Sequence, residues 1–149
     1  MTANIPYASR YNVYSMNSDG SDVRQLTDCY INGGGVSVCS TPSWSPDGTK
    51  IAFSDGDFIY GDNIGGAGIY IMNPDGTSIT PVSQDSDAWS FFPKWSSDGK
   101  KILFLYSPDG VQGVYSIKPD GTGLNQIIES TRRYWPFGID CSRCARFDQ

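Results

Sequence analysis

The chain has 149 residues, a net charge of −5 and a pI of about 4.4. Nucleic-acid binding requires a positive surface that displaces counterions, and a membrane-spanning helix requires roughly 18 apolar residues in a row; this acidic chain offers neither, so neither partner is predicted. Fifteen aspartates stand against one glutamate, Glu129, and because Asp favours turns and Glu favours helix interiors, the composition predicts an all-β fold.

The first predicted element is a β-hairpin over residues 11–27, built around the phrase VYSMNSDGSDVRQLT that begins at Val13. An Asp-Gly pair between two short apolar runs is a strong hairpin signal, because Gly accepts the positive φ of a tight turn. The same phrase returns as IYIMNPDGTSITPVS from Ile69 and as VYSIKPDGTGLNQII from Val114. Three copies without a gap predict a repeated structural unit.

A second hairpin phrase precedes each of the two later copies. It reads PSWSPDGTKIAFSD from Pro42 and PKWSSDGKKILFLY from Pro93. Each pair of phrases therefore predicts a four-stranded antiparallel meander, one over 42–83 and the next over 93–128. Pro81 falls in the last strand of its unit, which predicts that this strand lies at the outer edge of the sheet.

The phrases SWSPDGTKIAF and IYIMNPDGTSITPVS resemble the blade repeat of TolB-like β-propellers, and the resemblance covers roughly residues 11–128. It implies a β-propeller of WD-repeat-like, four-stranded antiparallel blades that pack around an axis, with about three blades in this chain. The motif is specific to the type of repeat and not to any one activity.

The C-terminal residues 136–147 are predicted to form a degenerate first hairpin, which complements the half blade over 11–27 within a single domain of residues 1–149. Three blades cannot close a ring, since propellers have about four to eight. Two chains that exchange their terminal hairpins would form a closed, six-bladed homodimer related by a twofold axis. The alternatives are a piece of a longer propeller, a short-lived gene fragment, and a stable three-bladed monomer.

Four cysteines, Cys29, Cys39, Cys141 and Cys144, invite both a disulfide and a zinc interpretation. The first pair brackets a connection between blades, whereas the second pair falls at a turn inside a blade, so the two pairs are expected on opposite faces. This placement favours a Cys29–Cys39 disulfide or free thiols, and no metal or cofactor is predicted. The resemblance favours a periplasmic or extracellular location, while an N-terminus without an apolar signal region argues the other way.

No histidine is present, which excludes Ser-His-Asp and Cys-His nucleophile activation and every histidine-ligated metal site. It also argues against those TolB-like propellers that act as pectate-type lyases, in which histidines hold the metal. The pairs Asp55–Asp57 and Asp85–Asp87 could perform acid–base chemistry or bind Ca²⁺. Asp is also the ordinary loop residue of this chain, so no catalytic residue is predicted.

The connections outside the repeat are the candidate ligand-binding segments. They join second to third strands or successive blades, so they are expected on one face, and loops on a rigid scaffold commonly carry function. Aromatic side chains with aspartates beside them suit peptide or sugar recognition, although some of these aromatics, Phe92 among them, could instead pack between blades. The predicted ligand-binding residues are Tyr30, Phe58, Tyr60, Asp85, Asp87, Trp89, Phe91, Tyr106 and Tyr134.

Two classes of function compete on these grounds. The first is a non-catalytic scaffold that presents its loop face and axial channel to a protein, peptide or glycan, and the resemblance to TolB-like interaction proteins favours it. The second is a glycan-active enzyme, or the propeller part of a hydrolase. A truncated or mobile gene product without a settled function is the third alternative.

Overall fold

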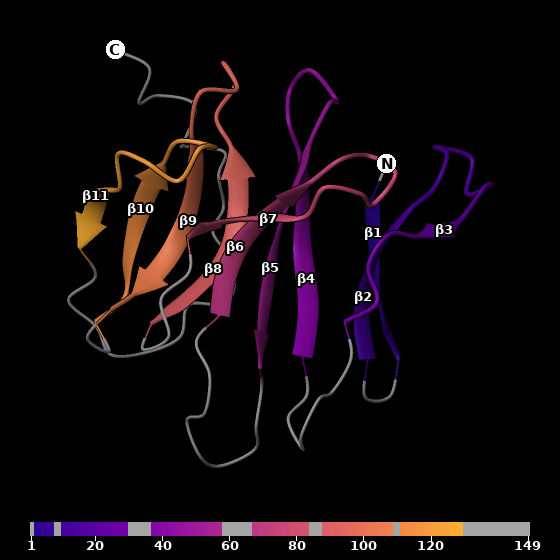
Figure 1. Ribbon diagram of the computed structural model, residues 1–149, viewed down its shortest axis with the longest axis horizontal. Coiled ribbons are helices and arrows are strands. Elements are labelled where there is room, and N and C mark those ends of the chain that lie inside the picture. The colour runs from indigo at the N-terminus through magenta and orange to yellow at the C-terminus, as the bar shows by residue number, and fades with distance from the viewer. Residues whose placement is uncertain are drawn as a thin grey trace.

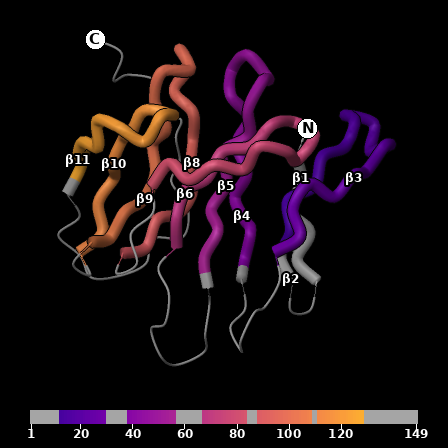
Figure 2. The backbone as a smooth tube through the Cα atoms, viewed as in Figure 1, coloured from indigo at the N-terminus to yellow at the C-terminus, as the bar shows by residue number. Residues whose placement is uncertain are grey.

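The computed structural model describes residues 2–7, 10–29, 37–57, 67–83, 88–108 and 111–129, and every regular element in these ranges is a β-strand (Figure 1). The strands form three successive units, which lie side by side in chain order (Figure 2). The first unit holds β1 (Thr2–Tyr7), β2 (Arg10–Ser15) and β3 (Arg24–Gln25). The second holds β4 (Ser37–Trp44), β5 (Ile51–Asp57), β6 (Ala67–Met72) and β7 (Thr80–Ser83). The third holds β8 (Trp89–Trp95), β9 (Ile102–Ser107), β10 (Gly113–Ile117) and β11 (Asn125–Glu129).

The second and third units confirm the predicted all-β fold of four-stranded antiparallel blades. Within each unit, neighbouring strands along the chain pair antiparallel in the order first, second, third, fourth. Short parallel contacts join the units, at Tyr11 with Val38 and at Ala67 with Trp89. The first strands β4 and β8 contact each other, which places them nearest the common axis. Pro81 lies in β7, which pairs only with β6 among the described strands. Proline has no N–H to donate to a second neighbouring strand, so this position at the outer edge suits it.

The first unit contains a strand that the sequence analysis did not predict. β1 pairs antiparallel with β2 from Thr2 opposite Ser15 to Tyr7 opposite Arg10, on the side where β5 pairs with β6 in the second unit. The two strands expected over 11–27 are therefore part of a three-stranded unit. This corrects the hairpin-exchange hypothesis in one respect: β1 already fills one of the two strand places that an exchanged hairpin would occupy.

In the repeated Asp-Gly turns that the structure describes, the aspartate before the glycine closes the turn. The Asp75 Oδ1 atom, for example, accepts hydrogen bonds from the Thr77 hydroxyl at 2.6 Å and from the Thr77 N–H at 2.9 Å. Such bonds favour the charged carboxylate, so they lower the pKa of each turn aspartate, with the hydroxyl bond as the largest cause and the backbone bond next. The five aspartates with a lowered pKa are Asp19, Asp47, Asp75, Asp98 and Asp120.

These turns predict a loss of stability in acid. Each turn carboxyl has a folded-state pKa below its reference value of 3.8, so its contribution is fully present above pH 3.8 and is lost as the pH falls through the lowered pKa. The urea midpoint, followed by tryptophan fluorescence, should therefore fall below that pH. The double variant Asp75→Asn/Asp120→Asn should flatten this fall, because an amide oxygen accepts the same bonds without titrating. An unchanged acid dependence would contradict the assignment, and Asp28→Asn, outside the turns, serves as the control.

Two hydrophobic clusters lie between neighbouring units and form the core. Because the middle strands pack against a unit on each side, β6 is buried on both of its faces, as in a stack of sheets. The cluster between the first and second units contains Val13, Leu26, Cys39, Ile51, Phe53 and Met72. The cluster between the second and third units contains Ala52, Ile69, Val82, Ala88, Ile102, Phe104, Tyr106 and Ile117.

Each later unit also contacts the preceding one through its second Asp-Gly turn. A Cβ atom on Gly76 would lie 2.5 Å from the carbonyl oxygen of Leu26, at the end of the first unit. A Cβ atom on Gly121 would lie 3.1 Å from the carbonyl oxygen of Val82, at the end of the second. The equivalent Gly20 in the first unit would meet no described atom within 4 Å. The same contact therefore occurs twice. At Gly76 the Leu26 backbone leaves no room for a Cβ atom, whereas at Gly121 the Val82 backbone would have to shift by a few tenths of an ångström.

Candidate functional site

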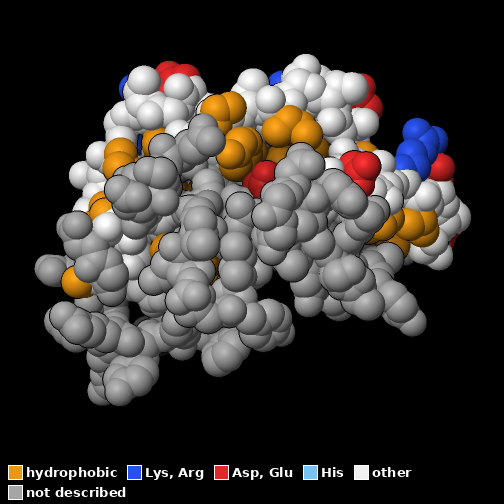
Figure 3. Space-filling view, turned by 60° about the horizontal axis from the view of Figure 1, so that its bottom comes forward, with side chains coloured by type: hydrophobic (Ala, Val, Ile, Leu, Met, Phe, Trp, Pro, Cys, Tyr) orange, Lys and Arg blue, Asp and Glu red, His pale blue; other side chains and the backbone are white. Residues whose placement is uncertain are grey.

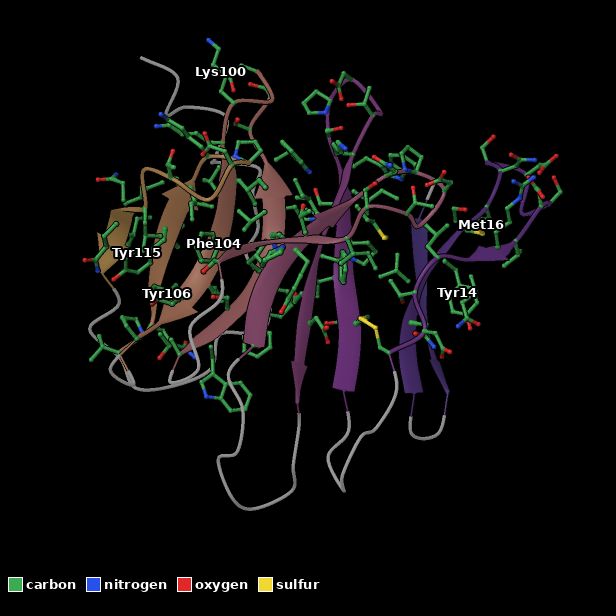
Figure 4. All side chains as sticks on the ribbon, in the orientation of Figure 1. Tyr14, Met16, Lys100, Phe104, Tyr106 and Tyr115 are labelled. Carbon is green, nitrogen blue, oxygen red and sulfur yellow. A yellow bond between two sulfur atoms is a disulfide. The ribbon has the colours of Figure 1, made fainter. Side chains whose placement is uncertain are left out.

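The two edges of the strand array differ in sequence character. The Asp-Gly turns lie at the upper edge in Figure 1, where Lys100 marks one of them in Figure 4. At the opposite edge β8 begins at Trp89, β9 ends at Ser107 and β6 begins at Ala67, so the connections outside the repeat leave from this side. Figure 3 turns this edge forward; on the described part of the face in view apolar side chains reach the surface, and the Lys and Arg side chains in view lie at its margins. We call it the loop edge.

A small pocket, open to solvent, lies at the loop edge of the third unit and has a cavity volume of about 20 Å³. Trp89 and Phe91 project from the same face of β8, with their ring centroids 5.7 Å apart. Leu105 lies opposite Phe91, and Ser107 lies opposite Trp89, across the β8–β9 pair. The lining residues are Trp89, Phe91, Phe92, Leu105, Tyr106, Ser107 and Gln112.

A β-bulge brings two consecutive phenylalanines into this pocket. The register of β8 against β9 shifts between Phe91 and Lys94, and Phe92 has a positive φ of 57°. In a regular strand consecutive side chains point to opposite faces, whereas a bulge redirects one of them. Phe91 and Phe92 consequently line one cavity, with centroids 6.3 Å apart. The second unit has an equivalent bulge at Thr41, which has a positive φ of 51° and, like Phe92, precedes a proline.

Tyr106 connects the pocket to the core. Its ring makes an edge contact with Tyr115 at a centroid distance of 5.1 Å and lies 6.0 Å from Phe104 (Figure 4). Only 8% of Tyr106 is exposed, so the pocket wall is held by packing between the second and third units. The Oε1 atom of Gln112 is buried and has no hydrogen-bond partner within the described part of the chain. An acceptor held among aromatic rings favours a ligand that carries both apolar surface and an N–H group.

The side chains that line the pocket are not repeated in the second unit. The registers of the two units align Pro42 with Pro93 and Tyr70 with Tyr115, which gives the second-unit equivalent of every lining position. None of these equivalent residues is aromatic, although the backbones of both units follow the same path. They are Val38, Ser40, Thr41, Ser54, Asp55, Gly56 and Ala67.

Three of the predicted ligand-binding residues, Trp89, Phe91 and Tyr106, lie together in this pocket. The pocket also uses Phe92 and Gln112, which the sequence analysis did not select because their convergence depends on the bulge and on the strand register. The other predicted residues lie outside the described part of the chain. They are Tyr30, Phe58, Tyr60, Asp85, Asp87 and Tyr134.

A second group of polar atoms surrounds the link between the first two units. Cys29 and Cys39 form a disulfide with a Cα–Cα distance of 5.9 Å, and Cys39 lies directly opposite Asp55 on the β4–β5 pair. Burial, and after it the negative charge of Asp55, raises the pKa of Tyr70, whose ring stacks on Phe53 at 5.8 Å. The side chain of Asp57 lies outside the described residues, so the predicted Asp55–Asp57 pair stays untested.

No family model matches the chain, but its sequence is similar to those of known proteins. It is 35% identical over 130 residues to the "Protein TolB homolog" of Chlorobium luteolum, covering 87% of this chain and 25% of that protein. It is 39% identical over 70 residues to the "Tol-Pal system protein TolB" of Alcanivorax borkumensis, which covers 47% of this chain and 15% of that protein.

A solved structure assigned as TolB of Agrobacterium tumefaciens matches with a TM-score of 0.61 and 25% identity, over 81% of this chain and 39% of that one. The chain thus spans about a quarter of the length of the Chlorobium relative. Within the described residues, no helix is long and apolar enough to cross a membrane. The blade phrases, the four-stranded units and these matches agree, and the chain belongs to the TolB-like β-propeller repeat family.

Proposed function

We propose that this chain is a non-catalytic protein-binding propeller module, which receives an apolar side chain of a peptide segment in the aromatic pocket of the third unit. The observation that carries this proposal is the contrast between the two complete units. Their backbones follow the same path, yet only the third places Trp89, Phe91 and Phe92 around a cavity. The second unit has the same backbone path without these rings, so we attribute their gathering in the third unit to recognition.

The chemistry of the pocket favours a peptide over a charged small molecule. Its wall is aromatic and aliphatic apart from Ser107 and Gln112, and it presents no described cationic side chain. Burying the Gln112 Oε1 atom without a donor is unfavourable, and an incoming peptide supplies a backbone N–H beside each apolar side chain. Trp and Tyr anchors in partly closed pockets dominate many protein interfaces.

The relatives support the same class of function. One of them is named as a protein of the Tol-Pal system, and a role among other proteins agrees with a binding module. The chain covers 15% of that relative, so the partners of the relative are not assigned to this chain. Binding measurements identify the partners of this chain.

Capped tripeptides with Trp, Phe, Leu or Ser at the centre test the proposal. We expect the three apolar peptides, and not the Ser peptide, to shift the Trp89 indole and Gln112 amide signals in nitrogen–proton NMR spectra. The Trp89→Ala variant should weaken this binding by about tenfold or more, because the variant loses the ring that closes the pocket. The matched control is Val23→Ala, which removes a 54% exposed apolar side chain of the first unit.

Two results would overturn the proposal. Equal shifts with the Ser peptide would show that the pocket does not select apolar side chains. Product formation from oligosaccharides, without peptide binding, would favour the glycan-active enzyme instead. Saturable peptide binding without turnover is the expected outcome.

We further propose that the three units are parts of one domain and that two chains associate through the first unit. β1 pairs only with β2 among the described strands, which leaves one edge of β1 for a single strand of a second chain. The expected donor, residues 136–147, lies outside the described residues. Light scattering over a wide dilution series should give the mass of two chains, and the mass of one chain would overturn the association.

The Cys29–Cys39 disulfide supports an extracytoplasmic location, since disulfides persist in oxidising compartments. Cell fractionation combined with thiol labelling should find the protein outside the cytoplasm with this pair oxidised. A cytoplasmic protein with two free thiols would contradict the assignment.

A further inference from the structure

We propose that Cys29, Cys39 and Asp55 form a redox-gated site for a divalent cation of the zinc class. One ligand atom from each of the three residues lies within 4.8 Å of the others. In the disulfide form the two sulfurs are bonded to each other, and thiolates, not disulfide sulfurs, are the ligands that hold zinc. After reduction, two thiolates and one carboxylate provide three ligands, which is the number in zinc sites that keep a fourth position open.

The fold holds all three residues without help from the disulfide. Cys39 and Asp55 are direct partners on neighbouring antiparallel strands, which brings their Cβ atoms to about 4.5–5.5 Å. Cys29 is positioned by the buried Asn12, whose Oδ1 accepts hydrogen bonds from the Cys29 N–H at 2.7 Å and from the Thr27 hydroxyl at 3.1 Å. These contacts do not involve the sulfur atoms, so we expect the three side chains to stay together when the S–S bond is opened.

The geometry suits a tetrahedral ion. Two thiolates bound at about 2.3 Å in tetrahedral arrangement lie about 3.8 Å apart. The Cα–Cα distance of 5.9 Å between Cys29 and Cys39 allows that spacing through side-chain rotation alone. Cys39 is 1% exposed, so water competes weakly for the ion on that side. The third unit has Ser90 and Tyr106 at the positions of Cys39 and Asp55, so the group is not imposed by the repeat.

Gating follows from the chemistry of the two sulfurs. A dithiol reductant supplies two electrons and two protons, the S–S bond becomes two thiols, and the reductant becomes a disulfide. Binding of the cation then forms two metal–sulfur bonds and releases both protons to solvent. Oxidant and metal therefore compete for the same two atoms. This inference is independent of the aromatic pocket, which lies in the third unit.

Cobalt(II) is the probe for the test, because thiolate ligation gives it a charge-transfer absorption band. The Cys141→Ser/Cys144→Ser background removes the other two thiols of the chain. We expect no band with the oxidised protein, a band that saturates at one equivalent after dithiol reduction and reductant removal, and loss of the band when Zn²⁺ is added. Asp55→Asn should weaken binding by about tenfold or more, since even residues that only orient ligands contribute that much.

The control variant is Asp28→Asn, which removes a carboxylate next to Cys29 that does not belong to the group and should leave the affinity unchanged. Far-ultraviolet circular dichroism establishes that the reduced protein and each variant stay folded, and Asp55→Ser replaces Asp55→Asn if the latter unfolds. The proposal is overturned if the reduced protein gives no band, if it unfolds on reduction, or if the Asp55 variants bind as tightly as their parent.

Discussion

The Gly76→Ala variant should lose about 2–5 kcal/mol of unfolding free energy, one of the largest effects expected in this chain. Two causes add together. Gly76 has a φ of +85°, a left-handed conformation that costs a residue with a Cβ atom about 1–2 kcal/mol. The new methyl group would also lie 2.5 Å from the Leu26 carbonyl oxygen, so the second unit would have to move away from the first. Urea unfolding followed by tryptophan fluorescence measures the loss.

Gly20→Ala is a matched control, because the same turn recurs there with a φ of +84° and the same aspartate closure by Asp19. Its Cβ atom would contact no described atom within 4 Å, so this variant should lose only the backbone term of about 1–2 kcal/mol. Equal losses in the two variants would contradict this explanation.

The blade architecture could be predicted from the sequence because its signals are local. Each Asp-Gly turn lies between two short apolar runs, and the structure closes each of them with the preceding aspartate, as at Asp47 and Asp98. Pro81 likewise marked the outer strand, because a residue without an N–H cannot sit between two paired neighbours. Both inferences depend on a few adjacent residues.

Features that depend on pairing between distant segments were not predictable in the same way. β1 has no repeat phrase and becomes a strand only through its register with β2. The first strands begin at Ser37 and Trp89, ahead of the prolines at 42 and 93 that mark the repeat, because a bulge carries the strand past each proline. No local pattern signals either event.

The same distinction applies to the two candidate sites. Trp89 and Phe91 could be selected because they lie in a segment outside the repeat, but Gln112 joins them only through the turn from β9 to β10. Asp55 becomes a neighbour of the Cys29–Cys39 pair only through the β4–β5 register, which places it opposite Cys39. Both sites occupy positions where one unit departs from the other, so comparison of the two registers locates them.

Phe104→Ala should cost about 3–5 kcal/mol of stability, since it empties a fully buried site between the second and third units. Phe104 has no exposed surface, and its ring lies 6.0 Å from that of Tyr106 (Figure 4). Because Tyr106 also lines the aromatic pocket, the cavity should loosen the pocket wall as well. The variant is therefore expected to lower the urea midpoint and, at temperatures where it remains folded, to weaken binding of the Trp-centred tripeptide.

Ile128→Ala is the control for this prediction, since Ile128 lies on the outer strand β11 and is 50% exposed. That variant should change stability by about 0.5 kcal/mol or less and leave peptide binding intact. Phe104→Leu should recover most of the lost stability, because a large apolar side chain fills much of the cavity. If Phe104→Ala weakens stability but leaves the tripeptide affinity untouched, the pocket is mechanically separate from the core between the units, and its rigidity must come from the β8 bulge instead.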